Sequence, residues 1–183
     1  MSFAEKLEKA ADRNRSLLCV GLDPDPDQMP VADLFEFNKA IVEATSDLVC
    51  AYKPNLGFYE SLGHAGYTAL QRTLECIPPH IPVIGDAKRG DVQPTSRFYA
   101  KALFESWGFD AVTVNPYGGQ DAIEPFLDYP EKGVIVWCRS SNPGAKEFQD
   151  VRIILPGSDS TCLLYEWVAM RAAAWNKAGN VGV

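Results

Sequence analysis

The feature that most constrains the fold is a regular alternation of short apolar runs with longer segments of helical periodicity. The apolar runs occupy residues 17–22, 48–52, 82–85, 111–114 and 133–137. Runs of this kind are typical of strands that are buried on both faces. The segments with helical spacing occupy roughly residues 34–45, 57–76, 95–107, 121–127 and 160–177. This alternation predicts right-handed βαβ units around a parallel sheet, and therefore an α/β fold.

The composition is that of a globular protein of this class. The 183 residues are 46% hydrophobic and 22% charged, which is enough apolar material for one sizeable core. The net charge of -7 argues against a general nucleic-acid-binding protein. No window approaches the length of a membrane-spanning helix, and residues 1–15 lack the apolar core of a signal peptide. We expect neither nucleic acid nor a membrane as a partner.

Cysteine and histidine usage predicts reduced thiols and no metal site. The five cysteines lie mostly inside apolar runs and show no Cys-x-x-Cys or zinc spacing. This pattern is typical of core thiols in a cytoplasmic protein. His64 and His80 are separated from each other and from any group of acids with ligand spacing.

The third apolar run ends in the most unusual group of charges. Asp86, Lys88 and Asp91 form an Asp-x-Lys-x-x-Asp pattern directly after Gly85. Residues two apart on a strand point to the same face, so Asp86 and Lys88 should lie side by side, with Asp91 in the following loop. A solvated surface cluster or structural ion pairs are the alternative interpretation. The position at a strand end, where α/β proteins place their sites, favours a function.

The other predicted strands also end in polar or charged residues. Asp23 follows the first run and Lys53 follows the second, while residues 115–119 and 138–144 follow the fourth and fifth. The carboxyl ends of parallel strands meet at one edge of the sheet. Five such ends in succession therefore predict a ring of functional side chains at one mouth of a barrel.

The number of units is smaller than a closed barrel requires. A β/α barrel needs eight units and typically about 250 residues. This chain has five units and, at residues 180–183, what looks like the opening of a sixth strand. We expect either an open parallel sheet or a single, apparently truncated β/α-barrel domain over residues 1–183.

Asp23, Lys53 and the Asp86-x-Lys88-x-x-Asp91 motif, in that order on successive strands, resemble the orotidine 5'-phosphate decarboxylase family. The segments 88–91 and 141–144 are most similar to its longer bacterial branch, and the similarity covers essentially the whole chain. The resemblance implies a (β/α)8 TIM-barrel fold. It also implies conversion of orotidine 5'-monophosphate to uridine 5'-monophosphate and carbon dioxide in de novo pyrimidine biosynthesis, without cofactor or metal, typically by a dimer.

The resemblance assigns a catalytic array of alternating charge to Lys53, Asp86, Lys88 and Asp91, with Lys88 as the proton donor to C6 of the pyrimidine. Loss of carbon dioxide leaves a carbanion at C6 without a cofactor to delocalise it, so nearby charges must stabilise it. An ammonium group about 4 Å away contributes roughly 4 kcal/mol at an effective dielectric near 20. One lysine alone cannot supply the whole effect.

The resemblance also assigns binding roles. Asp23 and Lys53 would bind the ribose hydroxyls, and Ser141 would contact the pyrimidine. Asp91 and Thr95 would reach into the site of a partner subunit in a homodimer. These roles predict a complete site only when two chains associate.

Two departures from the family pattern affect these expectations. The family usually has Asp-Ile-Gly after the catalytic lysine, whereas this chain has Asp91-Val92-Gln93-Pro94, which alters the loop that carries Asp91. The phosphate-binding backbone and arginine of the family come from its last two barrel units, which lie beyond these 183 residues. Because remote phosphate binding supplies energy for the chemical step, we expect the 183-residue form to be poorly active.

Two other functions are compatible with the motif. A magnesium-dependent sugar-phosphate decarboxylase of the same suprafamily would share Asp-x-Lys-x-x-Asp, but Lys53 lies where those relatives carry an acid and would repel the metal. A non-catalytic truncated barrel or assembly fragment would keep the charges and lack the phosphate site.

Overall fold

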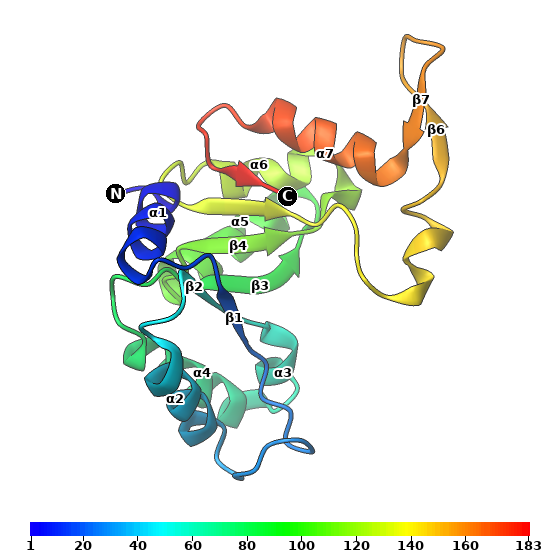
Figure 1. The fold of residues 1–183 in the computed structure, drawn as a ribbon. Coiled ribbons are helices and arrows are strands. Elements are labelled where there is room, and N and C mark those ends of the chain that lie inside the picture. Colours follow the sequence, from blue (N-terminus) through cyan, green and yellow to red (C-terminus); the bar gives the residue numbers. More distant parts are fainter.

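The computed structural model describes residues 1–183 and is built around six parallel strands (Figure 1). These are β1 (Cys19–Leu22), β2 (Ala51–Pro54), β3 (Ile84–Arg89), β4 (Ala111–Val114), β5 (Gly133–Val136) and β8 (Val181–Gly182). β1 pairs with β2, and β3, β4, β5 and β8 pair in this order. Isolated parallel bridges from Tyr52 to Val83 and from Asn55 to Asp86 join the two groups. The predicted parallel α/β fold is confirmed.

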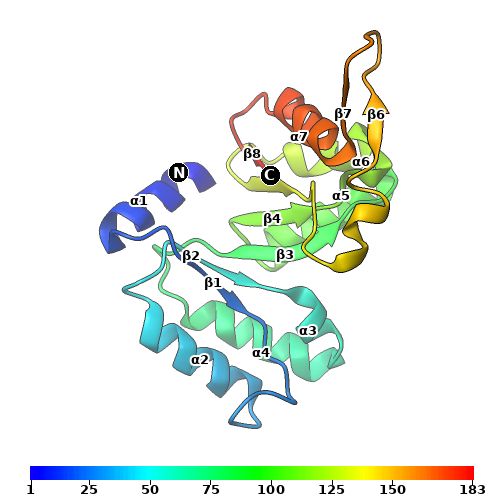
Figure 2. The same ribbon diagram turned by 45° about the vertical axis from the view of Figure 1, so that its right-hand side comes forward.

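Helices alternate with these strands along the chain. They are α1 (Phe3–Asn14), α2 (Leu34–Thr45), α3 (Leu56–Glu60), α4 (Gly63–Cys76), α5 (Gln93–Lys101), α6 (Gln120–Leu127) and α7 (Leu164–Trp175). Helices α5 and α6 lie behind β3, β4 and β5 in the view of Figure 1, while Figure 2 shows the same arrangement turned by 45°. A π-helical turn, Ala102–Ser106, extends α5, and 3-10 turns lie at Pro116–Gly118 and Pro143–Glu147. None of the helices is long and apolar enough to cross a membrane.

The prediction of a helix over residues 160–177 is wrong for its first residues. Thr161–Leu163 forms strand β7, which pairs in antiparallel register with β6 (Arg152–Ile154), and α7 begins only at Leu164. Between the two strands the chain turns through Gly157, whose φ of 75° is readily adopted only by glycine. The hairpin extends away from the sheet (Figure 1). Its β-branched residues favour short strands over a continued helix.

The helical segment expected over residues 57–76 is divided into α3 and α4. Gly63, with a φ of 56°, lies at the junction and allows the second helix to start in a new direction. Gly66 then lets α4 approach α3 closely, because a Cβ there would lie 1.9 Å from the carbonyl oxygen of Tyr59. The two helices pack together at this contact.

The main hydrophobic core lies between the strands and the helices. It is a cluster of 23 buried residues, which includes Tyr52, Val112 and Val134 from the strands, and Leu70 and Phe126 from α4 and α6. Burial of each large apolar side chain stabilises the fold by roughly 1.5–3 kcal/mol. This shared core holds neighbouring strands in a common register and so aligns their carboxyl ends.

Helix α1 covers the amino-terminal ends of the strands. Lys6 forms an ion pair with Asp110 at 2.8 Å, and Asp110 also accepts a hydrogen bond from the backbone N–H of Val83 at 2.9 Å. The Asn14 amide donates to the carbonyl oxygen of Val49 at 2.7 Å. These contacts occupy one end of the sheet, so the opposite, carboxyl-terminal end is where a site can open.

The close approach of Phe109 to β3 makes Gly85, the residue before Asp86, sensitive to substitution. A Cβ at Gly85 would lie 2.7 Å from the Phe109 ring, so Gly85→Ala should overpack the core and reduce the free energy of unfolding by about 1–3 kcal/mol. Gly21→Ala is the matched control, since its Cβ would lie 3.6 Å from the nearest atom. Urea denaturation measures both variants, and equal stability of the two would contradict this packing.

Candidate active site

Asp86 lies at the centre of a hydrogen-bonded network that joins three neighbouring strands. Its Oδ2 accepts from Lys53 Nζ at 2.8 Å, and its Oδ1 accepts from Lys88 Nζ at 2.5 Å and from the Thr113 hydroxyl at 2.8 Å. The Asp86 side chain is 8% exposed, whereas those of Lys53 and Lys88 are 34% and 38% exposed. A nearly buried carboxylate therefore serves as counterion to two ammonium groups that face an open mouth.

The parallel sheet brings these residues together. β2, β3 and β4 are neighbours, and the bridge between Asn55 and Asp86 aligns the end of β2 with that of β3. Lys53, Asp86 and Thr113 therefore project from adjacent strand ends, although 60 positions separate the first from the last in the sequence. The structure thus places Lys53, Asp86 and Lys88 together.

Lys88 has an uncommon backbone conformation. Its φ is 47°, in the left-handed region that few residues other than glycine adopt, and the β3–β4 register shifts between Gly85 and Arg89. The contact between Asp86 and Lys88 thus involves a local departure from the regular alternation of a strand. Such conformations cost of order 1–3 kcal/mol and persist where the surrounding structure holds them, commonly at functional sites.

The environment lowers the pKa of Asp86. Burial by itself would raise the pKa of this carboxyl, but the hydrogen bonds from Lys53, Lys88 and Thr113 outweigh that effect and bring the pKa below its usual value. Asp86 is therefore ionised at neutral pH. Lys53, Asp86 and Lys88 therefore form an alternating series of a positive, a negative and a positive group.

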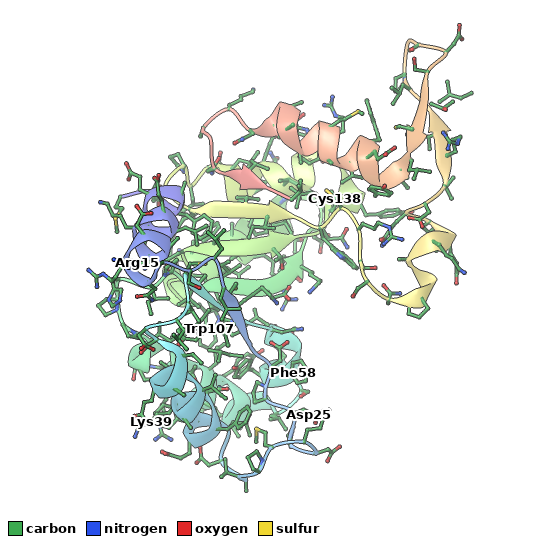
Figure 3. All side chains as sticks on the ribbon, in the orientation of Figure 1. Arg15, Asp25, Lys39, Phe58, Trp107 and Cys138 are labelled. Atoms are coloured by element: carbon green, nitrogen blue, oxygen red, sulfur yellow. The ribbon has the colours of Figure 1, made fainter.

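A cavity of about 430 Å³ opens beside the network. Lys88 and Thr113 line it together with mostly apolar side chains, among them Ile135 and Trp137 of the β5 region. The Lys88 ammonium lies 6.0 Å from the centroid of the Trp137 ring. Cys138, labelled in Figure 3 just beyond β5, also lines the cavity, and burial raises the pKa of its thiol. The cavity is therefore largely apolar, with the cationic side chains of Lys88 and Arg139 in its lining, and such a lining can hold a small molecule that carries negative charge.

Asp91 lies outside the network of its own chain; its predicted place in the four-residue array is in the site of a partner subunit. Its Oδ1 accepts from the backbone N–H of Val92 at 2.6 Å, and its own N–H donates to the Ser96 hydroxyl at 3.0 Å. Its carboxylate forms no ion pair within the chain. Pro94 lies in the first turn of α5, as its preference for helix starts predicts.

The remaining predicted residues lie at the same end of the sheet but do not contact Asp86. Asp23 follows β1 and is exposed, and its Oδ1 accepts from the backbone N–H of Asn55 at 3.2 Å, next to the end of β2. Thr95 is half-buried in the first turn of α5. Ser141 is exposed in the segment that follows β5.

Sequence reasoning did not single out Thr113 or Trp137 among the residues that line the cavity. Thr113 lies within the apolar run of β4, and Trp137 belongs to the run that forms β5. A polar residue near the end of an otherwise apolar strand is the signal that would have indicated Thr113. Trp137 had no such signal, because an aromatic residue is ordinary in a buried strand.

The fold and the site define a class of protein: a β/α-barrel protein with a charged site at the carboxyl ends of its parallel strands. Residues 16–183 match the family model described as Orotidine 5'-phosphate decarboxylase / HUMPS family. The chain belongs to this family, so the expected family and barrel fold are confirmed.

Individual relatives agree with this assignment. The chain is 54% identical to the orotidine 5'-phosphate decarboxylase of Thermomicrobium roseum and 48% identical to that of Dehalococcoides mccartyi, with all of this chain covered. It spans about two thirds of these curated relatives, 66% and 67% of their lengths. Among solved structures, Leishmania donovani OMP decarboxylase is 40% identical with a TM-score of 0.87, and the match covers 100% of this chain and 69% of that one.

Ionised Asp86 should contribute to stability in a pH-dependent way. Asp86→Asn leaves two lysines without their counterion and should lower the free energy of unfolding at pH 7 by about 1–3 kcal/mol, less than for a fully buried pair because both lysines are partly exposed. Since the folded pKa lies below the unfolded one, this contribution is complete above the usual aspartate value, about 3.9, and is lost as the pH falls through the folded value.

Urea denaturation of wild type and Asp86→Asn at pH 7 and at about pH 2 measures this difference. The stability gap should shrink at the lower pH. Asp159→Asn, a change at an exposed carboxylate in the β6–β7 turn, is the control and should show no gap at either pH. A gap for Asp86→Asn that stays constant with pH would contradict the ionised network.

Proposed function

We propose that the protein to which this chain belongs decarboxylates orotidine 5'-monophosphate to uridine 5'-monophosphate in pyrimidine biosynthesis. The observation that carries the proposal is the Lys53–Asp86–Lys88 network beside a mostly apolar cavity. Family membership and relatives named orotidine 5'-phosphate decarboxylase, a carboxy-lyase, support it. Because the chain spans about two thirds of those relatives, the proposal concerns the whole protein.

Lys88 is the central residue in the proposed reaction. The bond between C6 and the carboxylate carbon breaks, carbon dioxide leaves, and the electron pair stays on C6. The Lys88 ammonium stabilises this charge by roughly 4 kcal/mol at about 4 Å, and then transfers its proton to C6, while solvent returns a proton to the amine. Asp86 orients Lys88 and balances its charge through their contact at 2.5 Å. The proposed reaction uses no cofactor.

Lys53 and Asp23 are the proposed ribose-binding residues, and Ser141 is proposed to contact the pyrimidine. The position of Asp23, hydrogen-bonded to Asn55 two residues beyond Lys53, supports a shared role for the two at neighbouring strand ends. Ser141 lies in the segment that follows β5, two residues after Arg139, which lines the cavity. All three residues lie toward the carboxyl end of the sheet.

We further propose a homodimer in which Asp91 and Thr95 complete the partner's site. The absence of an ion pair between Asp91 and its own lysines supports this assignment. Around Asp91 two large apolar side chains are exposed to solvent, Val92 at 65% and Phe98 at 76%, and such side chains favour burial against another surface. A second copy of the chain would cover them and bring a second carboxylate to the array.

Residues 1–183 are proposed to belong to one barrel domain of a cytoplasmic protein. A single cluster contains most of the buried apolar residues, which supports one domain. All five cysteines are free thiols, which supports a reducing compartment.

Lys88→Ala tests the proposed activity. We expect turnover to fall by about 10³-fold, because roughly 4 kcal/mol of charge stabilisation and the proton donor are both lost. The assay is the loss of orotate absorbance, for the 183-residue chain and for a chimera that adds the C-terminal third of the Thermomicrobium roseum relative. Higher turnover is expected in the chimera.

Lys177→Ala, which removes an exposed lysine beyond α7, is the control and should leave turnover unchanged. An inactive chimera, despite an active relative assayed beside it, would count against the proposal. Undiminished turnover after Lys88→Ala would also reject it.

Mixing two inactive variants tests the dimer. Lys88→Ala subunits still carry Asp91, and Asp91→Asn subunits still carry Lys88, so a mixed dimer would contain one intact site. Random pairing should restore about a quarter of wild-type turnover, because half of the dimers are mixed and each has one working site of two. A mixture no more active than its separate components would contradict the exchange of Asp91.

A further inference from the structure

The hydroxyl of Thr113 connects the backbone of Lys88 to the side chain of Asp86. It accepts a hydrogen bond from the Lys88 backbone N–H at 3.0 Å and donates one to Asp86 Oδ1 at 2.8 Å. Both directions follow from the chemistry, because an N–H group can only donate and an ionised carboxylate can only accept. The oxygen that Thr113 contacts is the same Oδ1 that binds the Lys88 ammonium.

The contact lies where the sheet is irregular. Regular pairing of β3 with β4 is interrupted between Gly85 and Arg89, and Lys88 within this interval has a φ of 47°. Within this irregular interval, the Thr113 hydroxyl accepts a hydrogen bond from the backbone N–H of Lys88. It therefore stabilises the left-handed conformation of Lys88 from the neighbouring strand.

We propose that Thr113 is a positioning residue for the decarboxylation, acting through the backbone of Lys88 and the carboxylate of Asp86. This inference rests on the proposed function and adds a residue to it. Thr113 holds the turn that directs the Lys88 ammonium to Asp86 at the edge of the cavity, and it orients the oxygen that receives this ammonium. Small displacements of a reacting group can reduce rates by about 10²-fold, so such support has a kinetic consequence.

Threonine suits this position better than an apolar residue of equal shape. Its β-branched side chain has a restricted χ1, which keeps the hydroxyl between its two partners. Valine would fill the same space and remove both hydrogen bonds. Serine would keep the hydroxyl and lose only a methyl group, so the pair Thr113→Val and Thr113→Ser separates hydrogen bonding from packing.

Steady-state kinetics provide the first test, measured on the 183-residue chain or on the chimera, whichever turns over orotidine 5'-monophosphate. Thr113→Val should lower kcat by about 10- to 100-fold with KM changed less than about threefold, and Thr113→Ser should recover most of the lost kcat. The acid limb of the kcat profile should move to higher pH in Thr113→Val only. An unchanged kcat in Thr113→Val, a change in KM alone, or equal loss in both variants would overturn the inference.

A measurement that needs no turnover provides the second test. Asp86 is faced by Lys53 from β2, Lys88 from β3 and Thr113 from β4, and each of these hydrogen bonds lowers its pKa. Carbon-13 NMR of the Asp86 carboxyl in the 183-residue chain should therefore show a titration midpoint at higher pH in Thr113→Val and a wild-type midpoint in Thr113→Ser. Identical midpoints in all three proteins would overturn the inference.

The two tests separate this inference from the proposed function. If no form of the protein consumes orotidine 5'-monophosphate, the proposed function fails. A shifted Asp86 titration in Thr113→Val would then still support the positioning of Asp86 by Thr113. If turnover is normal in wild type and lost in Lys88→Ala but unaffected in Thr113→Val, the function stands and the positioning role of Thr113 is rejected.

Discussion

A nearly buried carboxylate held between two ammonium groups is the interaction on which the site depends. Removing a charge from water costs several kcal/mol unless close partners replace the lost hydration. Lys53, Lys88 and Thr113 provide three such partners to Asp86, each from a strand end. The architecture meets this requirement, because adjacent parallel strands that end at one edge place all three donors within hydrogen-bonding distance.

The same network connects stability with the proposed chemistry. Lysines paired with an ionised aspartate are already oriented before a substrate arrives, so little reorganisation is needed when negative charge develops. Ile135 and Trp137 form an apolar wall beside Lys88, and charge interactions next to apolar groups are stronger than in bulk water. Helix α1 blocks the opposite end of the sheet through Lys6 and Asp110, so the charged mouth is at the carboxyl-terminal end.

Sequence reasoning succeeded where the signal was local. Each of the five apolar runs forms a strand, and the charges that follow them meet at one edge of the sheet. It failed over residues 160–163, where a short strand of a hairpin looks like the start of the helix that follows it. Asp91, which the resemblance assigns to a partner's site, accepts from the Val92 backbone N–H within its own chain.

The sequence by itself determined the parallel α/β fold and the strand ends, because the alternation of apolar runs with helical segments can be read along the chain. The tertiary structure decided which distant residues meet at these strand ends. Lys53 lies 33 positions before Asp86 and Thr113 lies 27 positions after it, and their contacts depend on the alignment of separate strands. The backbone N–H of Lys88, a residue in the left-handed conformation, likewise donates to a hydroxyl from the neighbouring strand, a contact that no local pattern encodes.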